Sequence, residues 1–283
     1  MNQPQKTIKR SLTLSGKGLF TGETVTLNIH PAPIGHGIVF QRVDLPGKPL
    51  IPAKLDYVSD SVRCTRLATK SASVLMVEHL LSAISALELD NLLIEVEGPE
   101  MPACDGSSKI FVDLFEQGGI VFQEGPRRIF KVTKPIFYSQ NETHLIALPS
   151  DEFRISYTLH YPQSSLLGSQ YFSLAVKPDV YKNEIAPCRT FSLFEEISPL
   201  IEQGLIKGGG LENALVIKGE RVLNPEGMRY TDEMVRHKIL DLIGDLSLLG
   251  GFLIAHVFAI RSGHSSNIAF AKHLSTQMNE SHD

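Results

Sequence analysis

Hydrophobic and polar residues alternate near the start of the chain. Val25, Leu27 and Ile29 are separated by polar residues, which predicts a half-buried strand. An apolar series with helical spacing follows and predicts a helix over residues 73–87. The other elements expected in this half are strands at 38–42 and 92–96 and a helix at 108–117 that ends at Gly118-Gly119.

A cluster of turn residues at 124–126, Glu-Gly-Pro, interrupts this pattern and is the best candidate for a domain boundary. Because the strands come in consecutive runs and do not alternate with helices, the sequence predicts an α+β fold. We expect one domain at 1–125 and a second at 126–283, each with several strands and helices. The elements expected in the second are strands at 129–132, 144–148, 153–159, 214–217 and 253–260 and helices at 193–203, 231–249 and from about 265 onward.

The predicted helix 231–249 carries a polar stripe beside its apolar one. His237, Asp241 and Asp245 have the spacing i, i+4, i+8, so they lie one turn apart on the same face. A histidine and an aspartate at this spacing can both reach one metal ion, but they also form an ordinary stabilising pair. Apolar neighbours such as Ile239 strengthen the functional interpretation and leave both open, because buried polar groups need a partner or a purpose.

Two further segments carry related groups. Glu78-His79 lies among apolar residues in the predicted helix 73–87, where it borders a cavity or else faces the surface. His264 follows Gly263 in a turn before the last helix, a common place for a histidine. Together the three segments supply two histidines and a carboxylate as ligands, plus Glu, Lys and His for proton chemistry. That is the inventory of a catalytic zinc site with an open position.

Composition narrows the class of protein. The net charge of −4 and the absence of a basic excess argue against a nucleic-acid-binding protein. The cysteines, Cys64, Cys104 and Cys188, form no CxxC pair, so neither a disulfide framework nor a thiolate zinc site is expected. No secretory signal is visible, and the longest apolar stretch, 250–260, is too short to span a bilayer. We therefore expect a cytoplasmic monomer with at most peripheral membrane contact.

Several motifs carry a resemblance to a known family. They run almost from end to end and, with their order, are highly specific: GKGLFTG at 16–22, VEHL at 77–80, DN at 90–91, PEMP at 99–102, DGS at 105–107, RTF at 189–191, GGGLENA at 208–214, RHKILDxxGD at 236–245 and SGH at 262–264. In these motifs the chain resembles the UDP-3-O-acyl-N-acetylglucosamine deacetylases, zinc enzymes of the committed step of lipid A synthesis in Gram-negative bacteria.

The resemblance implies two similar domains, each a helix layer packed on a mainly antiparallel sheet, with the active site between them. It implies a small-molecule substrate, an acylated UDP-sugar, and zinc as the metal, although Fe²⁺ accepts the same ligands. The roles implied are metal ligands at His79, His237 and Asp241; a general base at Glu78; a cation at His264, oriented by Asp245; substrate contacts at Thr190 and Lys238; and an acyl-chain passage bordered by Phe191, Ile197, Gly210 and Val216.

Some positions depart from the family pattern. Phe20 stands where the family usually has histidine, and Met76 where it has threonine or serine. Two other functions are compatible with the same residues. A metal-dependent phosphodiesterase often uses two metals and more carboxylates than are found here. A non-catalytic module could bind an acylated nucleotide sugar and hold a structural zinc, which normally has four protein ligands.

Overall fold

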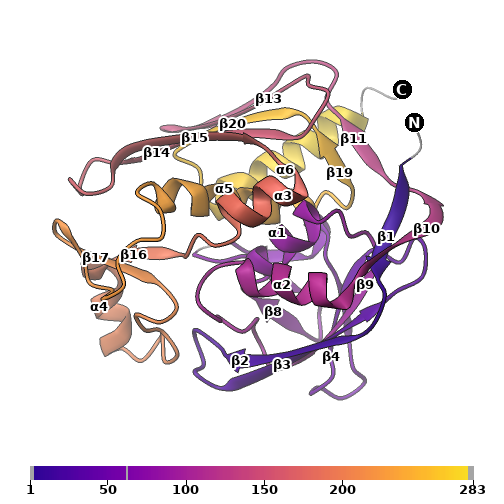
Figure 1. Ribbon diagram of the computed structural model, residues 1–283, viewed down its shortest axis with the longest axis horizontal. Helices are drawn as coiled ribbons and strands as arrows, with labels where there is room; N and C mark the ends of the chain where they lie inside the picture. The colour runs from indigo at the N-terminus through magenta and orange to yellow at the C-terminus, as the bar shows by residue number, and fades with distance from the viewer. Residues whose placement is uncertain (1–2, 62, 280–283) are drawn as a thin grey trace.

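The computed structural model describes residues 3–61 and 63–279. It consists of two halves, each a sheet with helices, that face each other through their helices (Figure 1). The sheets form the outer layers. Two helices, α1 (Glu78–Ala86) and α5 (Glu233–Ser247), pack against each other between them. The predicted α+β class with two similar halves is confirmed.

The first half is built on a five-stranded sheet in the order β2-β3-β9-β4-β5. Its neighbouring strands are antiparallel except for β4 and β9, which are parallel. A row of side chains across the sheet, Ile29, Ile94, Phe40 and Ile51, is completely buried. Burial of each contributes roughly 1.5–3 kcal/mol. The strands and helices of this half besides α1 are β1 (Pro4–Ile8), β2 (Leu12–Lys17), β3 (Thr24–Pro31), β4 (Ile38–Arg42), β5 (Leu50–Pro52), the 3-10 helix η1 (Leu55–Tyr57), β6 (Val58–Asp60), β7 (Arg66–Ala68), β8 (Ser73–Leu75), β9 (Leu92–Glu97), α2 (Lys109–Gly118) and β10 (Ile120–Pro126).

The second half repeats this topology. Its five-stranded sheet has the order β12-β13-β20-β14-β15, with β14 and β20 as the parallel pair. Taken in chain order within each sheet, both sheets therefore follow the order 1-2-5-3-4. The strands and helices of this half besides α5 are β11 (Ile129–Lys131), β12 (Ile136–Gln140), β13 (Thr143–Leu148), β14 (Arg154–Tyr161), β15 (Gly168–Ala175), α3 (Pro178–Val180), the π-helix η2 (Tyr181–Ile185), β16 (Phe191–Leu193), α4 (Phe194–Glu202), β17 (Leu215–Lys218), β18 (Arg221–Val222), β19 (Phe252–Ile254), β20 (His256–Ile260) and α6 (His264–Asn279).

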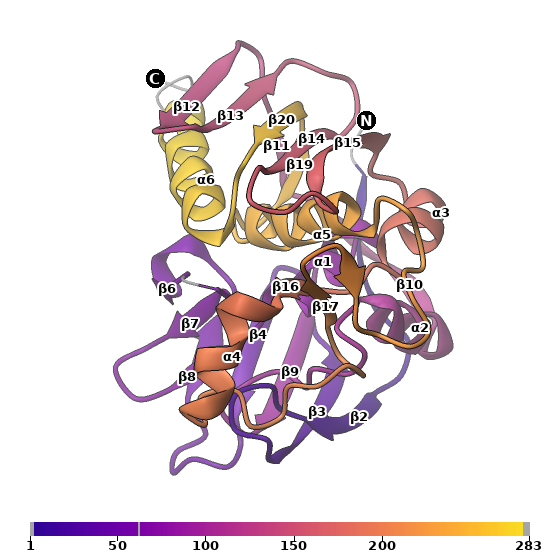
Figure 2. The ribbon, with the colours of Figure 1, turned by 90° about the vertical axis from the view of Figure 1, so that its left-hand side faces the viewer.

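Each half carries an insert at the same place in the repeat, between the fourth strand of its five-stranded sheet and its central helix, α1 or α5. The first insert, residues 53–77, contains the three-stranded sheet β6-β7-β8. The second insert, residues 176–232, contains α4 and the three-stranded sheet β16-β17-β18. The second insert, with α4, β16 and β17, lies at the end of the molecule that faces the viewer in Figure 2. Residues of both inserts line the same cavity.

Most of the predicted elements are present, and two expectations are wrong. The helix expected at 73–87 begins only at Glu78, because Ser73–Leu75 pairs with β7 as a strand. Met76 has a positive φ of 61°, which a right-handed helix cannot contain. The single strand expected at 253–260 is two strands, since β19 pairs with β11 and β20 joins the five-stranded sheet. The domain boundary expected after residue 125 lies within β10 and stays a prediction.

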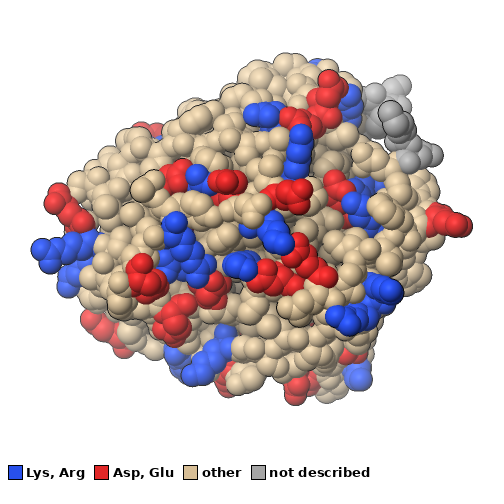
Figure 3. All heavy atoms as spheres, in the orientation of Figure 1, with Lys and Arg blue, Asp and Glu red and all other residues tan. Residues whose placement is uncertain are grey.

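The surface gives no sign of a single-sign charge field on the face drawn in Figure 3. Acidic and basic side chains lie interspersed across the middle of this face. Within residues 3–61 and 63–279, no helix is long and apolar enough to cross a membrane.

Candidate active site

The close crossing of α1 and α5 places the candidate metal ligands next to each other. Gly244 makes this crossing possible, because a Cβ atom there would lie 2.1 Å from the carbonyl oxygen of Glu78. His79 follows Glu78 on α1, and His237 and Asp241 lie on α5 on the turns before Gly244. All three are buried, and their ligand atoms lie within 4.8 Å of one another. The structure therefore brings together two imidazoles and one carboxylate from segments far apart in the sequence.

The arrangement of these three side chains fits a divalent metal ion. Asp241 Oδ1 lies 3.3 Å from His237 Nε2 and 3.6 Å from His79 Nε2. Ligand atoms about 2.0–2.1 Å from a tetrahedral ion are separated by about 3.3 Å. Although Asp241 Oδ1 is buried, it accepts no hydrogen bond from any described residue. A buried carboxylate oxygen of this kind is costly without a cation beside it, and an ion among the three groups would satisfy it.

The His237 ring is held by the second insert. Its Nδ1 lies 3.0 Å from the carbonyl oxygen of Cys188, so Nδ1 carries the donated proton and Nε2 faces Asp241. The next residue, Arg189, donates from its backbone nitrogen to Glu233 Oε1 at 2.9 Å and from its Nε to the same oxygen at 3.0 Å. Glu233 is completely buried one turn before His237. The fully buried Arg189–Glu233 pair thus fixes the carbonyl that orients the ring.

The second oxygen of Asp241 pairs with a lysine. Lys238 Nζ lies 2.8 Å from Asp241 Oδ2 and 5.9 Å from the centre of the Phe191 ring. Burial lowers the pKa of Lys238, but Asp241, Tyr157 and Tyr161 together outweigh burial, and the net shift of the pKa is upward. Burial also raises the pKa of Asp241, while Lys238 and His237 hold it well below its usual range. Both groups therefore carry charge at neutral pH.

A second pair of titratable groups faces the same space. Glu78 is buried, and its Oε1 lies 3.8 Å from His264 Nε2. Burial raises the pKa of Glu78 above its ordinary value. His264 Nδ1 lies 2.9 Å from Asp245 Oδ2. Burial lowers the pKa of His264, but the carboxylates of Asp245 and Asp241 outweigh it and raise the pKa to about 9. A carboxylate that can accept a proton thus faces an imidazole that can hold one.

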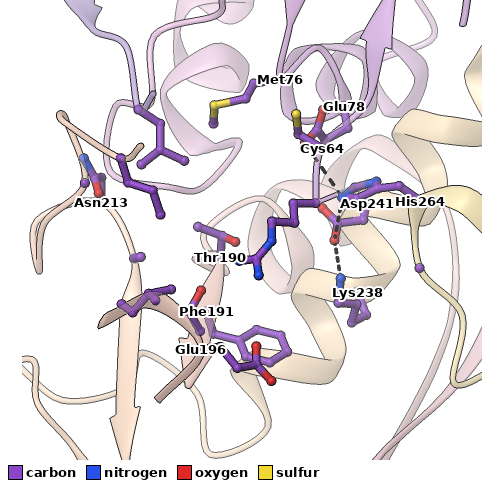
Figure 4. A pocket seen from close by; sticks show the side chains of 18 of the residues that line it. Cys64, Met76, Glu78, Thr190, Phe191, Glu196, Asn213, Lys238, Asp241 and His264 are labelled. Carbon is purple, nitrogen blue, oxygen red and sulfur yellow. Dashed lines mark hydrogen bonds and ion pairs between the residues drawn. The ribbon is translucent and has the colours of Figure 1, made fainter. Parts of the chain in front are cut away.

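These groups lie on the wall of a cavity of about 860 Å³. Figure 4 shows Glu78, Asp241, His264 and Lys238 on one side of it, with Thr190 and Phe191 on the wall beside them. Apolar residues of the second insert and of the loop after β2 also line the cavity, and we call this part of the lining its apolar arm: Leu19, Phe20, Phe191, Phe194, Ile197, Ile201, Ile206, Leu211, Val216 and Leu223.

Comparison with known proteins agrees with this site. The family model for UDP-3-O-acyl N-acetylglycosamine deacetylase matches residues 5–276. The chain belongs to this family. A UDP-3-O-acyl-N-acetylglucosamine deacetylase of Chlamydia pneumoniae is 49% identical over 273 residues, which are 96% of this chain and 97% of that protein. Relatives with the same name from Chlamydia felis and Chlamydia trachomatis serovar L2 are 44% and 43% identical, and the matches cover 96% and 97% of this chain and 97% and 96% of theirs.

For this member of the deacetylase family, the structure places every residue singled out from the sequence at or next to the cavity. Thr190, Phe191, Gly210 and Lys238 line it, and so do Glu78, His79, Asp241 and His264. His237 and Asp245 lie directly behind, in contact with Asp241 and His264. Their roles stay predictions, and we take them up below.

Sequence reasoning missed several residues of the site. Arg63 and Cys64 of the first insert line the cavity, as do Tyr161 at the end of β14 and Arg261 after β20. Arg63 has a positive φ of 68°, an uncommon conformation for a residue with a side chain. Neither spacing nor an apolar flank marks these positions.

The departures from the family pattern at Phe20 and Met76 lie on the cavity. Phe20 lines it from the loop after β2, and its backbone nitrogen donates to Glu100 Oε2 at 3.0 Å. Met76 lines it from the residue pair before α1. Each places an apolar side chain where the family usually has a polar one. Neither contacts the three candidate ligands by any hydrogen bond within the described residues.

Proposed function

We propose that this protein hydrolyses the N-acetyl group of UDP-3-O-acyl-N-acetylglucosamine, releasing acetate, in the committed step of lipid A synthesis. The observation that carries the proposal is the site itself. A buried His-His-Asp group faces a Glu–His pair at one end of a cavity with an apolar arm. Membership of the deacetylase family and the names of the relatives support the same reaction.

Zinc is the proposed metal, held by His79, His237 and Asp241. Two neutral imidazoles and one carboxylate are a common ligand set of catalytic zinc sites, and they leave a position open for water or substrate. Fe²⁺ accepts the same ligands. When bound, the ion supplies Lewis acidity, which polarises an amide carbonyl and lowers the pKa of water from about 15.7 toward roughly 7. The three ligands are a poor match for a structural zinc site, which normally has four protein ligands.

Glu78 acts as the general base. It removes one proton from the attacking water as the water oxygen bonds to the acetyl carbonyl carbon, and its raised pKa suits a group that must bind and release a proton. The hydroxyl of Thr190, on the cavity wall, donates to the carbonyl oxygen as negative charge develops there. The Lys238 ammonium, paired with Asp241, adds positive charge at the same end of the cavity.

His264 supplies the proton that the leaving amine needs. The bond between the carbonyl carbon and nitrogen breaks, the proton passes from His264 Nε2 to the nitrogen, and the free amine and acetic acid result. The acetic acid then releases its remaining proton, to the amine or to solvent, and leaves as acetate. The proton on Glu78 then restores His264, directly or through water, since their nearest atoms are 3.8 Å apart. Asp245 behind Nδ1 keeps the ring protonated and its Nε2 aimed into the cavity.

The two ends of the substrate have different surroundings in the cavity. The acyl chain lies along the apolar arm, between Phe191 and the segment that contains Ile197, Gly210 and Val216. The diphosphate needs cations, and Arg63 and Arg261 line the cavity, the latter paired with Glu142 at 2.7 Å. An arginine fork suits a phosphate group well. This division accounts for a cavity that is apolar on one side and charged on the other.

The test is deacetylation of UDP-3-O-acyl-N-acetylglucosamine by the purified protein, followed by acetate release. We expect turnover that a chelator abolishes and that zinc restores. A folded, zinc-loaded protein that binds the substrate and does not turn it over would refute the enzymatic proposal in favour of a binding module.

A further inference from the structure

Thr65 of the first insert hydrogen-bonds to two carboxylates of the site, Glu78 and Asp245, through two different atoms. Its backbone nitrogen donates to Glu78 Oε2 at 3.0 Å. Its hydroxyl donates to Asp245 Oδ1 at 2.6 Å. The side chain is completely buried, so neither bond competes with solvent. One residue of the insert therefore bridges α1, which carries Glu78, and α5, which carries Asp245.

The backbone bond distinguishes the two oxygens of Glu78. Oε2 accepts from the Thr65 nitrogen, whereas Oε1 is the oxygen that faces His264 Nε2 at 3.8 Å. A carboxylate held by one oxygen keeps the other at a fixed place. Oε1 is therefore the oxygen that is free to take a proton from water.

The hydroxyl bond completes the hold on Asp245. Oδ2 of Asp245 accepts from His264 Nδ1 and from Asn267 Nδ2, each at 2.9 Å, and Oδ1 accepts from Thr65. With both oxygens engaged from different directions, the carboxylate cannot rotate away from the ring. An ionised carboxylate only accepts, so His264 Nδ1 is the donor and Nε2 is left to face the cavity.

We propose that Thr65 is a positioning residue of the deacetylation reaction, which sets the orientation of His264 through Asp245 and selects Oε1 of Glu78 as the base. The inference rests on the proposed function, because it assigns Thr65 a part in that reaction. The hydroxyl and the backbone nitrogen of Thr65 hold Asp245 and Glu78 at the same time. The first insert therefore has to fix the position of the Thr65 backbone as well as that of its side chain. Neither bond touches the candidate metal ligands, so metal binding does not depend on the hydroxyl.

The decisive variant is Thr65→Val, which keeps the shape and the backbone bond and removes only the hydroxyl. We expect kcat to fall about 10–100-fold, as for other partners that orient a catalytic group from behind. KM and zinc content should stay within about twofold of the parent protein. Thr65→Ser, which keeps the hydroxyl, should recover most of kcat. Thr65→Ala removes the same hydroxyl with a smaller side chain and replaces the Val variant if that variant does not fold.

The matched control is Thr7→Val. Thr7 is also buried in the first half, and its hydroxyl donates to the carbonyl oxygen of Asn91 at 2.6 Å, away from the cavity. We expect a lower melting temperature and an unchanged kcat. An equal fall in kcat for Thr7→Val and Thr65→Val would mean that loss of a buried hydroxyl acts through stability alone, which would overturn the proposal.

A double-mutant cycle tests the route through the ring. If Thr65 acts through Asp245 and His264, Thr65→Val should have almost no further effect on kcat in a His264→Ala background. A full 10–100-fold loss in that background would overturn this route. An unchanged kcat for Thr65→Val, with an active parent protein, would refute the role of Thr65 and leave the proposed function standing. An inactive parent protein would instead refute the proposed function.

Discussion

The two halves of the molecule share a scaffold and differ in their inserts. Both five-stranded sheets follow the same order, and both present a helix, α1 or α5, to the centre. The first insert is short and places Arg63, Cys64 and Thr65 beside Glu78. The second insert is longer, and its α4 and β16-β17-β18 sheet supply an apolar wall. The scaffold thus sets where the site lies, and the inserts set what each side of it contacts.

This difference suggests a division of labour. The first insert contacts the groups that move protons, through Thr65 and its bonds to Glu78 and Asp245. The second insert contacts the space assigned to the acyl chain, through residues such as Phe191 and Val216. Changes on the first side should therefore appear mainly in kcat, and changes in the apolar arm mainly in the dependence on chain length.

The largest effect is expected for Glu78→Gln. The amide has nearly the same shape but cannot take a proton, so kcat should fall 10²–10⁴-fold, the usual contribution of a general base. KM should change little, because Glu78 is assigned no part in binding the substrate. Steady-state kinetics with a saturating zinc concentration checks this.

Glu97, an exposed residue at the end of β9 in the same half, offers the control, and Glu97→Gln should be as active as the parent protein. More than about a tenth of the parental kcat in Glu78→Gln would contradict the base assignment and, with it, the division between the halves.

The sequence predicted the scaffold better than the inserts, for physical reasons. Alternation and helical spacing mark elements that bury one face, such as β3 and α2. The short strands of the inserts have no such signal, because their positions depend on pairing with distant segments. Ser73–Leu75 illustrates this: its residues extend the helical pattern of α1, but pairing with β7 and the positive φ of Met76 make it a strand.

The sequence likewise predicted some residues of the candidate site and missed others. Spacing on one helix indicated His237 and Asp241, because i, i+4 residues share a face on any helix. The partners Glu78-His79 and His264 came from the inventory of residue types and from the family resemblance. Contacts such as the Thr65 hydroxyl on Asp245 join residues 180 positions apart and exist only in the folded chain. No local pattern could have indicated them.

A smaller effect, and one that sharpens the division, is expected for Glu233→Gln. Glu233 fixes Arg189 and the adjacent Cys188 carbonyl, which holds the His237 ring. Loosening the ring should weaken zinc binding about 10–100-fold, as is typical of partners behind a metal ligand. Competition with a chelator measures this directly. The second insert would then contribute to the metal site, through the Cys188 carbonyl, as well as to the apolar arm.

Glu226→Gln is the matched control for this change. Glu226 pairs with the same Arg189 but is more than half exposed, and exposed ion pairs contribute only about 0–1 kcal/mol. Zinc affinity should therefore stay near that of the parent protein. Equal losses in both variants would show that the charge of Arg189 matters and that its backbone bond to Glu233 does not.

The smallest effect, counted for each methylene group of the substrate, is expected for changes along the apolar arm. Gly210 lines the cavity, but a Cβ atom there would lie 2.1 Å from the Glu212 carboxylate. Once this flexible side chain moves aside, Gly210→Trp would fill part of the space assigned to the acyl chain. Each methylene group kept out of the arm forfeits about 0.8 kcal/mol, or about fourfold in kcat/KM. The ratio of parental to variant kcat/KM should therefore grow as the acyl chain of the substrate is lengthened and stay near one for the shortest chain, which serves as the internal control. If all chain lengths lose activity equally, the acyl chain does not run past Gly210, and the apolar wall of the second insert has some other use.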